Sequence, residues 1–247
     1  MNMFKNIVPP KPGISQQGGW IMSQSWENVL FMHWPISAKL LQTHIPKELT
    51  IDTYDGTAWL GIVLFSTNGV YLRGMPSISL LPICPEINVR TYVKYNGKPG
   101  VYFLSLDVSN WVLYTIAKHW FHLSYFPANI SSQKIKNIFH FESKRIKSKK
   151  EIIQFDCKFE TNSNDYLAKE DTLEHWLTEK YCFFSNDQKG NIYRCDIDHT
   201  QWTLQNVDLT ISINTMCTPL NFRLPNTSPI THFSPGVETI LWNIKKI

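Results

Sequence analysis

The sequence predicts a mainly β protein of the α+β class, in which an antiparallel sheet, either closed or sandwiched, carries a few helices. Aromatic residues make up 13% of the 247 residues, and these residue types favour pleated, half-buried surfaces. About eight segments have strand-like patterns, and most of them follow one another through turns. The hydrophobic fraction of 43% is enough to bury a full core, and we expect residues 1–247 to form a single domain.

The strongest strand signal lies in residues 86–108, where two alternating runs flank an Asn-Gly turn. This arrangement predicts a β-hairpin. Six further strands are predicted at residues 27–34, 58–65, 138–144, 152–160, 192–197 and 202–213.

Two helices interrupt the strands, one ending at Phe121 and one at about Cys182. The candidate N-caps are Ser109 or Asn110 for the first and Asp171 or Thr172 for the second. Glu174 follows Asp171 by three residues, the spacing at which its side chain could complete a capping box with Asp171 as the N-cap. An amphipathic pattern in the second helix is formed by Leu173, Trp176, Leu177 and Tyr181.

One face of the predicted hairpin carries unusually polar side chains. With the period of two of a strand, Glu86, Asn88 and Arg90 share a face with Tyr92, and Ile87 lies on the other. Burying such groups without partners costs several kcal/mol, roughly, so they face either water or a polar cavity. A solvated amphipathic strand and the interior of a barrel both satisfy this pattern. In a cavity, Arg90 could bind a carboxylate and Glu86 could act as a general acid or base.

Composition narrows the classes of function. The net charge of +4 comes from residues 134–150, which hold seven Lys or Arg against one Glu. A solvated hairpin is the favoured interpretation of this patch, and binding of nucleic acid or anionic lipid is the weaker alternative. We therefore expect no nucleic-acid partner.

Five scattered cysteines indicate reduced thiols, and no apolar run approaches the roughly 18 residues of a membrane span. The expected location is the cytoplasm, with no membrane partner. The sequence lacks HExxH, GxSxG, GxxxxGK[ST] and a GxGxxG after a strand. His119 and His122 are three residues apart without further ligands nearby, so neither a metal site nor a cofactor is expected.

Several stretches resemble the YqjF-like family of bacterial proteins of unassigned function, in the acetoacetate decarboxylase-like superfamily. The resemblance runs almost end to end. The stretches that carry it lie at residues 26–35, 55–59, 86–93, 100–107, 117–128 and 232–237, of which Glu-Ile-Asn-Val-Arg-Thr-Tyr-Val at 86–93 is the most specific. This resemblance implies a closed, cone-like β-barrel with an internal pocket.

The decarboxylases hold a Schiff-base lysine in a segment that resembles residues 117–128. An ungapped match puts Tyr125 and Phe126 where two lysines would stand, and neither ring can replace an amine nucleophile. Glu86 resembles a functional glutamate of that superfamily. Lys118 and Ser124 stand where the nearer family would have Arg and Pro, and a Lys cannot offer a planar fork to a carboxylate.

Two hypotheses follow. The first is a polar pocket that binds a small carboxylate or carbonyl compound, without Schiff-base chemistry; the alternative is a non-catalytic sensor or interaction module on the same fold. A homo-oligomer is compatible with either. The candidate catalytic residues are Glu86 and Arg90, and the candidate binding residues are His33, Trp34, Asn88, Tyr92, Asp107 and Tyr125.

Overall fold

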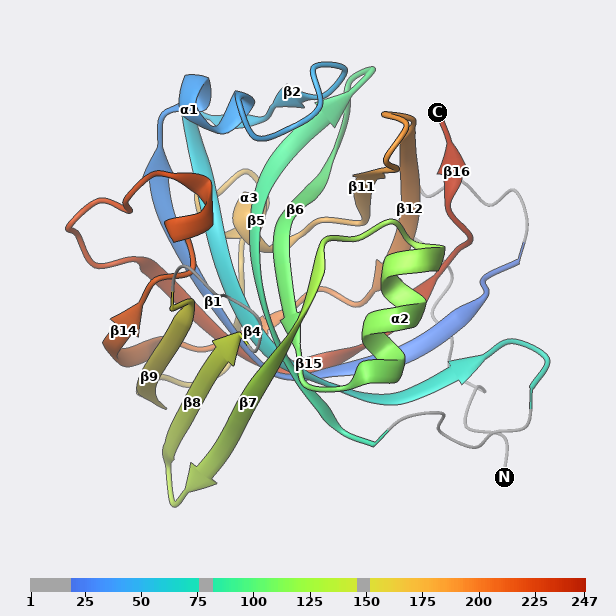
Figure 1. The fold of residues 1–247 in the computed structure, drawn as a ribbon. Coiled ribbons are helices and arrows are strands. Elements are labelled where there is room, and N and C mark those ends of the chain that lie inside the picture. The colour runs from blue at the N-terminus through green and yellow to red at the C-terminus, as the bar shows by residue number, and fades with distance from the viewer. Residues whose placement is uncertain (1–18, 76–81, 146–151) are drawn as a thin grey trace.

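Strands dominate the computed structural model, which describes residues 19–75, 82–145 and 152–247 (Figure 1). Fourteen strands belong to one sheet, and β10 and β13 form a separate pair. The strands are β1 (Met22–Ile36), β2 (Thr50–Ile51), β3 (Thr53–Tyr54), β4 (Thr57–Leu72), β5 (Cys84–Tyr95), β6 (Lys98–Val108), β7 (Tyr125–Ile135), β8 (Ile138–Arg145), β9 (Gln154–Thr161), β10 (Tyr166–Leu167), β11 (Cys182–Asn186), β12 (Ile192–His199), β13 (Thr203–Leu204), β14 (Val207–Asn214), β15 (Ile230–Leu241) and β16 (Lys245–Lys246).

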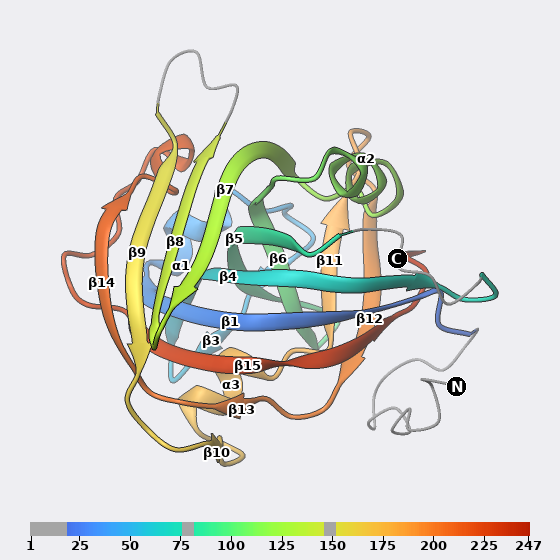
Figure 2. The ribbon, with the colours of Figure 1, turned by 90° about the horizontal axis from the view of Figure 1, so that it is seen from below.

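The pairings close into a ring that runs from β6 through β11, β12, β15, β1, β4 and β5 and back to β6. Figure 2 shows β15, β1 and β4 side by side across the molecule. The expectation of a mainly β fold with a closed sheet is confirmed. The expectation of antiparallel pairing holds for most of the sheet, but β6 pairs in parallel with both β11 and β7.

A second layer, β7, β8, β9 and β14, continues from β6 and stands against the outside of the ring (Figure 2). Phe139, Phe141 and Phe155 of this layer are buried in one core cluster with Leu30 and Val89 of the ring. Burial of apolar side chains contributes about 25 cal/mol per Å², so this contact is a major source of stability.

The helices are α1 (Ala38–Gln42), α2 (Trp111–Trp120), α3 (Leu173–Thr178) and a 3-10 turn, η1 (Thr218–Leu220). Asn110 caps α2, as predicted, and its side chain accepts hydrogen bonds from two backbone N–H groups of the first turn. The second predicted helix is much shorter, because α3 ends at Thr178 and β11 begins at Cys182. Thr172 is the N-cap of α3, so the prediction of a capping box that begins at Asp171 is wrong.

The predicted hairpin is confirmed as β5 and β6, with Asn96 and Gly97 both at positive φ in the turn. Segment 202–213 was predicted as one strand but divides into β13 and β14. Strand β7 lacks clear apolar alternation because its side chains are mostly exposed or half-buried. Strand β15 contains Pro235 and Gly236, which weaken any strand pattern.

The basic patch is in part a solvated hairpin, since Lys134 and Lys136 lie at the exposed β7–β8 turn. Arg145 is different, because its side chain is buried in an ion pair. Three lysines of the patch, Lys147, Lys149 and Lys150, lie outside the described residues.

All five cysteines are buried and free. No helix within the described ranges has both the length and the apolar character needed to cross a membrane.

Gly236 allows β15 to approach β1 closely. Its φ is +140°, and a Cβ built there would lie 2.2 Å from the backbone oxygen of Trp26. We expect Gly236→Ala to lower the free energy of unfolding by at least about 2 kcal/mol, measured by urea denaturation. Gly56→Ala is the matched control, because Gly56 also has a positive φ but has open space around it, and it should cost only about 1 kcal/mol. Equal losses in the two variants would contradict the steric argument.

Candidate functional site

A cavity of about 120 Å³ lies inside the ring of strands, and α2 covers one side of it. All seven strands of the ring contribute to its wall, so the interior of the ring is not completely filled by side chains. The polar lining residues are Gln24, Glu86, Asn88 and Tyr125. The apolar lining residues are Ile21, Met22, Trp26, Phe65, Val70, Leu72, Phe103, Leu106, Leu113, Ile116, Ala117, Trp120, Phe121, Leu123, Phe183, Ile197 and Leu241.

Glu86 is the carboxylic acid among the described residues that line this cavity, and its side chain is almost completely buried. Its carboxylate accepts hydrogen bonds from the hydroxyl groups of Thr67 and Tyr125, the latter at 2.6 Å. Burial raises the pKa of Glu86 to about 7, against the opposing effect of these two hydrogen bonds. The carboxyl group therefore exists in both protonation states near neutral pH, as a general acid or base requires.

Asn88 is the second buried polar residue of the cavity wall. It is 3% exposed, and its Oδ1 atom has no hydrogen-bond partner among the described residues. A buried amide oxygen without a partner costs about 1–3 kcal/mol. A donor group on a molecule in the cavity would remove that cost.

An irregularity in the hairpin shapes the cavity. Val89 of β5 lies opposite Ser105, but the next residue, Arg90, lies opposite Phe103, so Leu104 is an extra residue in β6. As a result Phe103 and Leu106 both face the cavity, although strict alternation predicts opposite faces. This bulge is not visible in the sequence, because Leu104 matches the apolar pattern of the strand.

Arg90 lies on the same face of β5 as Glu86 but outside the residues that line the cavity. Four residues of extended strand separate their Cα atoms by about 13 Å. The Arg90 guanidinium carbon lies 5.4 Å from the ring centre of Phe31 and 5.8 Å from that of Tyr92. Its Nε and Nη2 atoms are buried, and they have no hydrogen-bond partner within the described part of the chain.

His33 and Tyr92 belong to the surroundings of Arg90. The Tyr92 hydroxyl donates to the backbone oxygen of Leu177 at 2.7 Å, so it accepts from Nε2 of His33, also at 2.7 Å. This arrangement assigns the proton of a neutral His33 to Nε2. Burial lowers the pKa of His33 well below its usual value, and the nearby Arg90 lowers it further.

Lys180 contacts the same aromatic group. Its Nζ atom lies 4.2 Å from the ring centre of Trp176 and 5.3 Å from that of Tyr92. Burial lowers the pKa of Lys180 to about 8, although Asp52 opposes the shift. Lys180 was not predicted from the sequence, because an isolated lysine between a helix and a strand belongs to no pattern.

Two predicted site residues lie elsewhere. Trp34 is buried on the face of β1 opposite to that of its neighbour His33. It donates a hydrogen bond to the backbone oxygen of Thr227 at 3.1 Å. Asp107 is fully buried and forms a two-pronged ion pair with Arg145, with distances of 2.6 and 3.2 Å. The structure thus brings Glu86, Asn88 and Tyr125 together in the cavity, groups His33, Arg90 and Tyr92 beside it, and separates Trp34 and Asp107 from both.

Other residues of the site were not predicted from the sequence. Gln24 and the inner face of α2 line the cavity, and Thr67 lies outside the lining but donates a hydrogen bond to Glu86. Trp120 lines the cavity and also donates to the Asn243 side chain at 3.1 Å, which fastens the end of α2 to the C-terminal segment. The only available signal was the apolar spacing of Leu113, Ile116 and Ala117 in the predicted helix.

The raised pKa of Glu86 predicts a particular dependence of stability on pH. Because its folded-state pKa of about 7 exceeds its ordinary value of 4.5, its contribution to stability is fully present below about pH 4.5. That contribution is lost as the pH rises through about 7, and its size is about 3 kcal/mol.

We expect the difference in unfolding free energy between Glu86→Gln and the wild type to increase by that amount from pH 4.5 to 8, as measured by urea denaturation. The exposed Glu160 provides a matched control, and Glu160→Gln should keep the pH profile of the wild type. Parallel profiles for the wild type and Glu86→Gln would show that the Glu86 pKa is not raised.

The ion pair between Asp107 and Arg145 predicts a large loss of stability when one partner is removed. Arg145→Met leaves a buried carboxylate unpaired, so it should lower the free energy of unfolding by about 3–5 kcal/mol. The double variant Asp107→Leu with Arg145→Met should recover much of that loss in the same denaturation assay. Lys144→Met, at an exposed neighbouring position, is the control and should change stability by less than about 0.5 kcal/mol. An Arg145→Met variant as stable as this control would contradict the prediction.

Comparison with known proteins agrees with the fold and with the resemblance of the motifs. Residues 23–238 match the family DUF2071, described as an uncharacterized conserved protein. The chain is 37% identical over 242 residues to the uncharacterized protein YqjF of Bacillus subtilis strain 168. The aligned region covers 98% of this chain and 96% of that protein. The resemblance to the YqjF-like family is thereby confirmed.

Solved structures share the architecture at low sequence identity. Acetoacetate decarboxylase from Legionella pneumophila is similar with a TM-score of 0.65 and 12% identity, covering 100% of this chain and 94% of that one. The enduracididine biosynthesis enzyme MppR, complexed with pyruvate, has a TM-score of 0.63 and 8% identity, covering 98% of this chain and 93% of that one. At these identities the likeness shows the fold alone, and the expected acetoacetate decarboxylase-like fold is confirmed.

Proposed function

Because this chain belongs to the DUF2071 family, whose description assigns no activity, we propose a function from its cavity: binding of a small, mainly apolar carbonyl compound, with Glu86 exchanging a proton with it. The observation that carries the proposal is a buried carboxyl group with a pKa of about 7 in a mostly apolar cavity. When protonated, Glu86 can donate a hydrogen bond to a carbonyl oxygen. When ionised, it can accept a proton from the ligand.

The lining favours a neutral carbonyl compound over a carboxylate. Neither Lys nor Arg is among the described residues that line the cavity. A carboxylate would place a second negative charge beside Glu86 without a cation to offset it, and this costs several kcal/mol, roughly, in an apolar surrounding. Arg90 does not line the cavity, and its guanidinium group packs beside the rings of Phe31 and Tyr92.

The same lining supports a mechanism without a Schiff base. Tyr125 stands where the resemblance expects the first lysine, and its hydroxyl donates to Glu86. Phe126, at the second position, is half-exposed beside the Arg145 guanidinium. On the same fold, MppR has been solved with pyruvate and with a condensation product of pyruvate and imidazole 4-carboxaldehyde, so keto acids are the comparison set against which neutral carbonyl compounds are tested.

The alternative function is a sensor that binds the compound and leaves it unchanged. Buried free thiols suit a reducing compartment, so we place either activity in the cytoplasm as part of the proposal.

A thermal-shift screen tests the proposal. It compares the rise in Tm caused by neutral ketones, aldehydes and lactones with the rise caused by keto acids of matched size. A ligand at 100 times its Kd adds about 2.7 kcal/mol, which raises the Tm by several degrees. We expect neutral carbonyl compounds to raise the Tm of the wild type, and Glu86→Leu and Asn88→Leu to weaken binding at least about tenfold. Arg90→Met is the control and should bind as the wild type does.

Other results would overturn parts of the proposal. Unchanged binding in Glu86→Leu and Asn88→Leu would exclude the cavity, and a keto acid that loses affinity in Arg90→Met would establish carboxylate binding instead. Incubation with a bound carbonyl compound and borohydride should leave the lysines unmodified by mass spectrometry, whereas an adduct on Lys180 would establish an imine. Recovery of the compound unchanged after long incubation would favour the sensor over the enzyme.

A further inference from the structure

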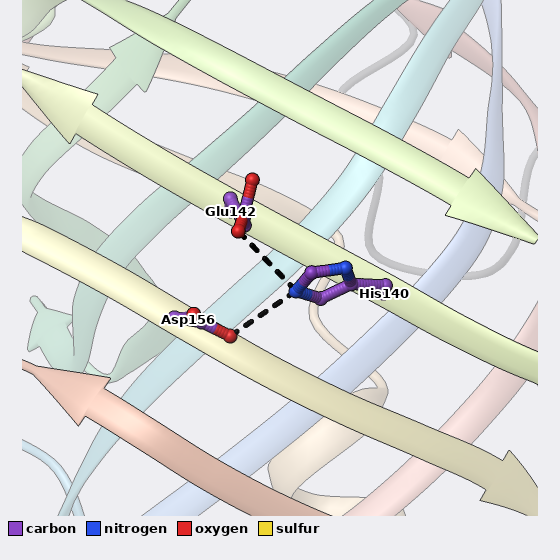
Figure 3. Close-up of side chains that lie close together, drawn as sticks. All are labelled: His140, Glu142 and Asp156. Carbon is purple, nitrogen blue, oxygen red and sulfur yellow. Dashed lines mark hydrogen bonds and ion pairs between the residues drawn. The ribbon is translucent and has the colours of Figure 1, made fainter.

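Three side chains of types that can bind a metal ion lie close together on the outer face of the second layer, away from the cavity. His140 and Glu142 project from β8 and Asp156 from the adjacent β9 (Figure 3). Nε2 of His140 lies 3.4 Å from Oε1 of Glu142 and 3.3 Å from Oδ1 of Asp156. The three ligand atoms all lie within 4.8 Å of one another.

The strand pattern explains why these residues share a face. Phe139, Phe141 and Phe155 point inward to the core, so the residues that alternate with them point outward. Glu142 and Asp156 are directly opposite one another in the β8–β9 pairing, and His140 is two residues along the same strand. The position of each ligand is thus set by a paired strand and not by a loop.

The two carboxylates of this arrangement are neighbours, and the lysines nearest to them in the strand register, Lys158 opposite His140 and Lys144 two residues beyond Glu142, are exposed to solvent. Two carboxylates directly opposite one another across a strand pair destabilise the pairing. His140 lies beside both and supplies at most one positive charge, and only when it is protonated. A divalent ion between the three groups would neutralise both carboxylates and leave His140 as a neutral ligand.

The spacing fits the coordination shell of a small transition ion. Ligands at about 2.0–2.1 Å from a tetrahedral Zn²⁺ lie about 3.3–3.4 Å from one another. The two distances from His140 Nε2 match this edge length. Glu142 is 54% exposed in its side chain and can rotate to shorten the remaining distance.

We propose that His140, Glu142 and Asp156 form a binding site for a divalent first-row transition ion of the Zn²⁺ type, which connects β8 to β9. An imidazole nitrogen suits Zn²⁺, whereas Ca²⁺ and Mg²⁺ take oxygen ligands. Three protein ligands leave one or more positions for water. The site replaces the expectation from sequence that no metal is bound, which considered only His119 and His122.

Isothermal titration of chelator-treated full-length protein with ZnCl₂ tests the site, and CoCl₂ provides a visible spectrum. We expect one Zn²⁺ per chain and Co²⁺ bands without a thiolate charge-transfer band, because all five cysteines are buried and Cys157, next to Asp156, lies in the core cluster. His140→Ala and Asp156→Asn should each weaken Zn²⁺ binding at least about tenfold. His119→Ala, which removes an exposed histidine of α2, is the matched control and should bind as the wild type does.

The ligands lie outside the core, so the apo variants should melt within about 2 °C of the apo wild type, which separates metal binding from misfolding. Zn²⁺ should raise the Tm of the wild type and of His119→Ala, but not that of His140→Ala. Equal Zn²⁺ affinity in the wild type and His140→Ala would overturn the proposal. Ca²⁺ binding as tight as Zn²⁺ binding would also overturn it, because it would reduce the site to a pair of acidic residues.

Discussion

The architecture depends on how β6 shares its hydrogen bonds. One edge of this strand pairs with β5 along its whole length. The other edge is divided, since Val101 and Tyr102 pair with β11 and residues 106–108 pair with β7. Buried backbone groups need partners, so two different strands must cover this edge. One of them closes the ring, and the other begins the second layer.

The bulge at Leu104 lies between these two pairings, and it connects the division of the edge to the cavity. A bulge bends a strand and increases its twist, which suits a strand that leaves one neighbour for another. It also turns Phe103 and Leu106 to the same side. Because β7 begins at the point of division, Tyr125 is placed beside Leu106, and its hydroxyl reaches Glu86. The hydrogen bond that holds the carboxyl group therefore follows from backbone pairing.

Sequence patterns predicted what is local in this protein. The Asn96–Gly97 turn, the Asn110 cap and the shared face of Glu86, Asn88 and Arg90 all depend on neighbouring residues, and each is present. The closed ring followed from the number of strands together with the resemblance. Strand β15 was missed because its partner β1 lies far away in the sequence and Pro235 and Gly236 interrupt its pattern. Strand β7 was missed although its partner β8 follows it directly, because its mostly exposed side chains leave no apolar alternation.

The site residues divide in the same way. The residues of the polar face of β5 were predictable from the sequence. It was not predictable that Glu86 would line the cavity while Arg90 packs against aromatic rings beside it. It depends on which side chains from β1, β4 and α3 fill the space, and no local pattern contains that information. Asp107 was chosen for its charge on a strand, and its partner Arg145 comes from a segment that composition alone assigns to the solvent.

The closure of the ring has a consequence for how the chain reaches its folded state. Strand β1 pairs with β15 along eleven residue pairs, from Met22 with Leu241 to His33 with Ile230. The ring can therefore close only after residues 230–241 have been synthesised and can reach β1. Contacts of such long sequence separation slow folding, since the chain entropy is lost before the pairing is gained. Until that moment β1 has only β4 beside it, and its other edge presents unpaired backbone groups, which is the kind of edge that favours pairing between chains.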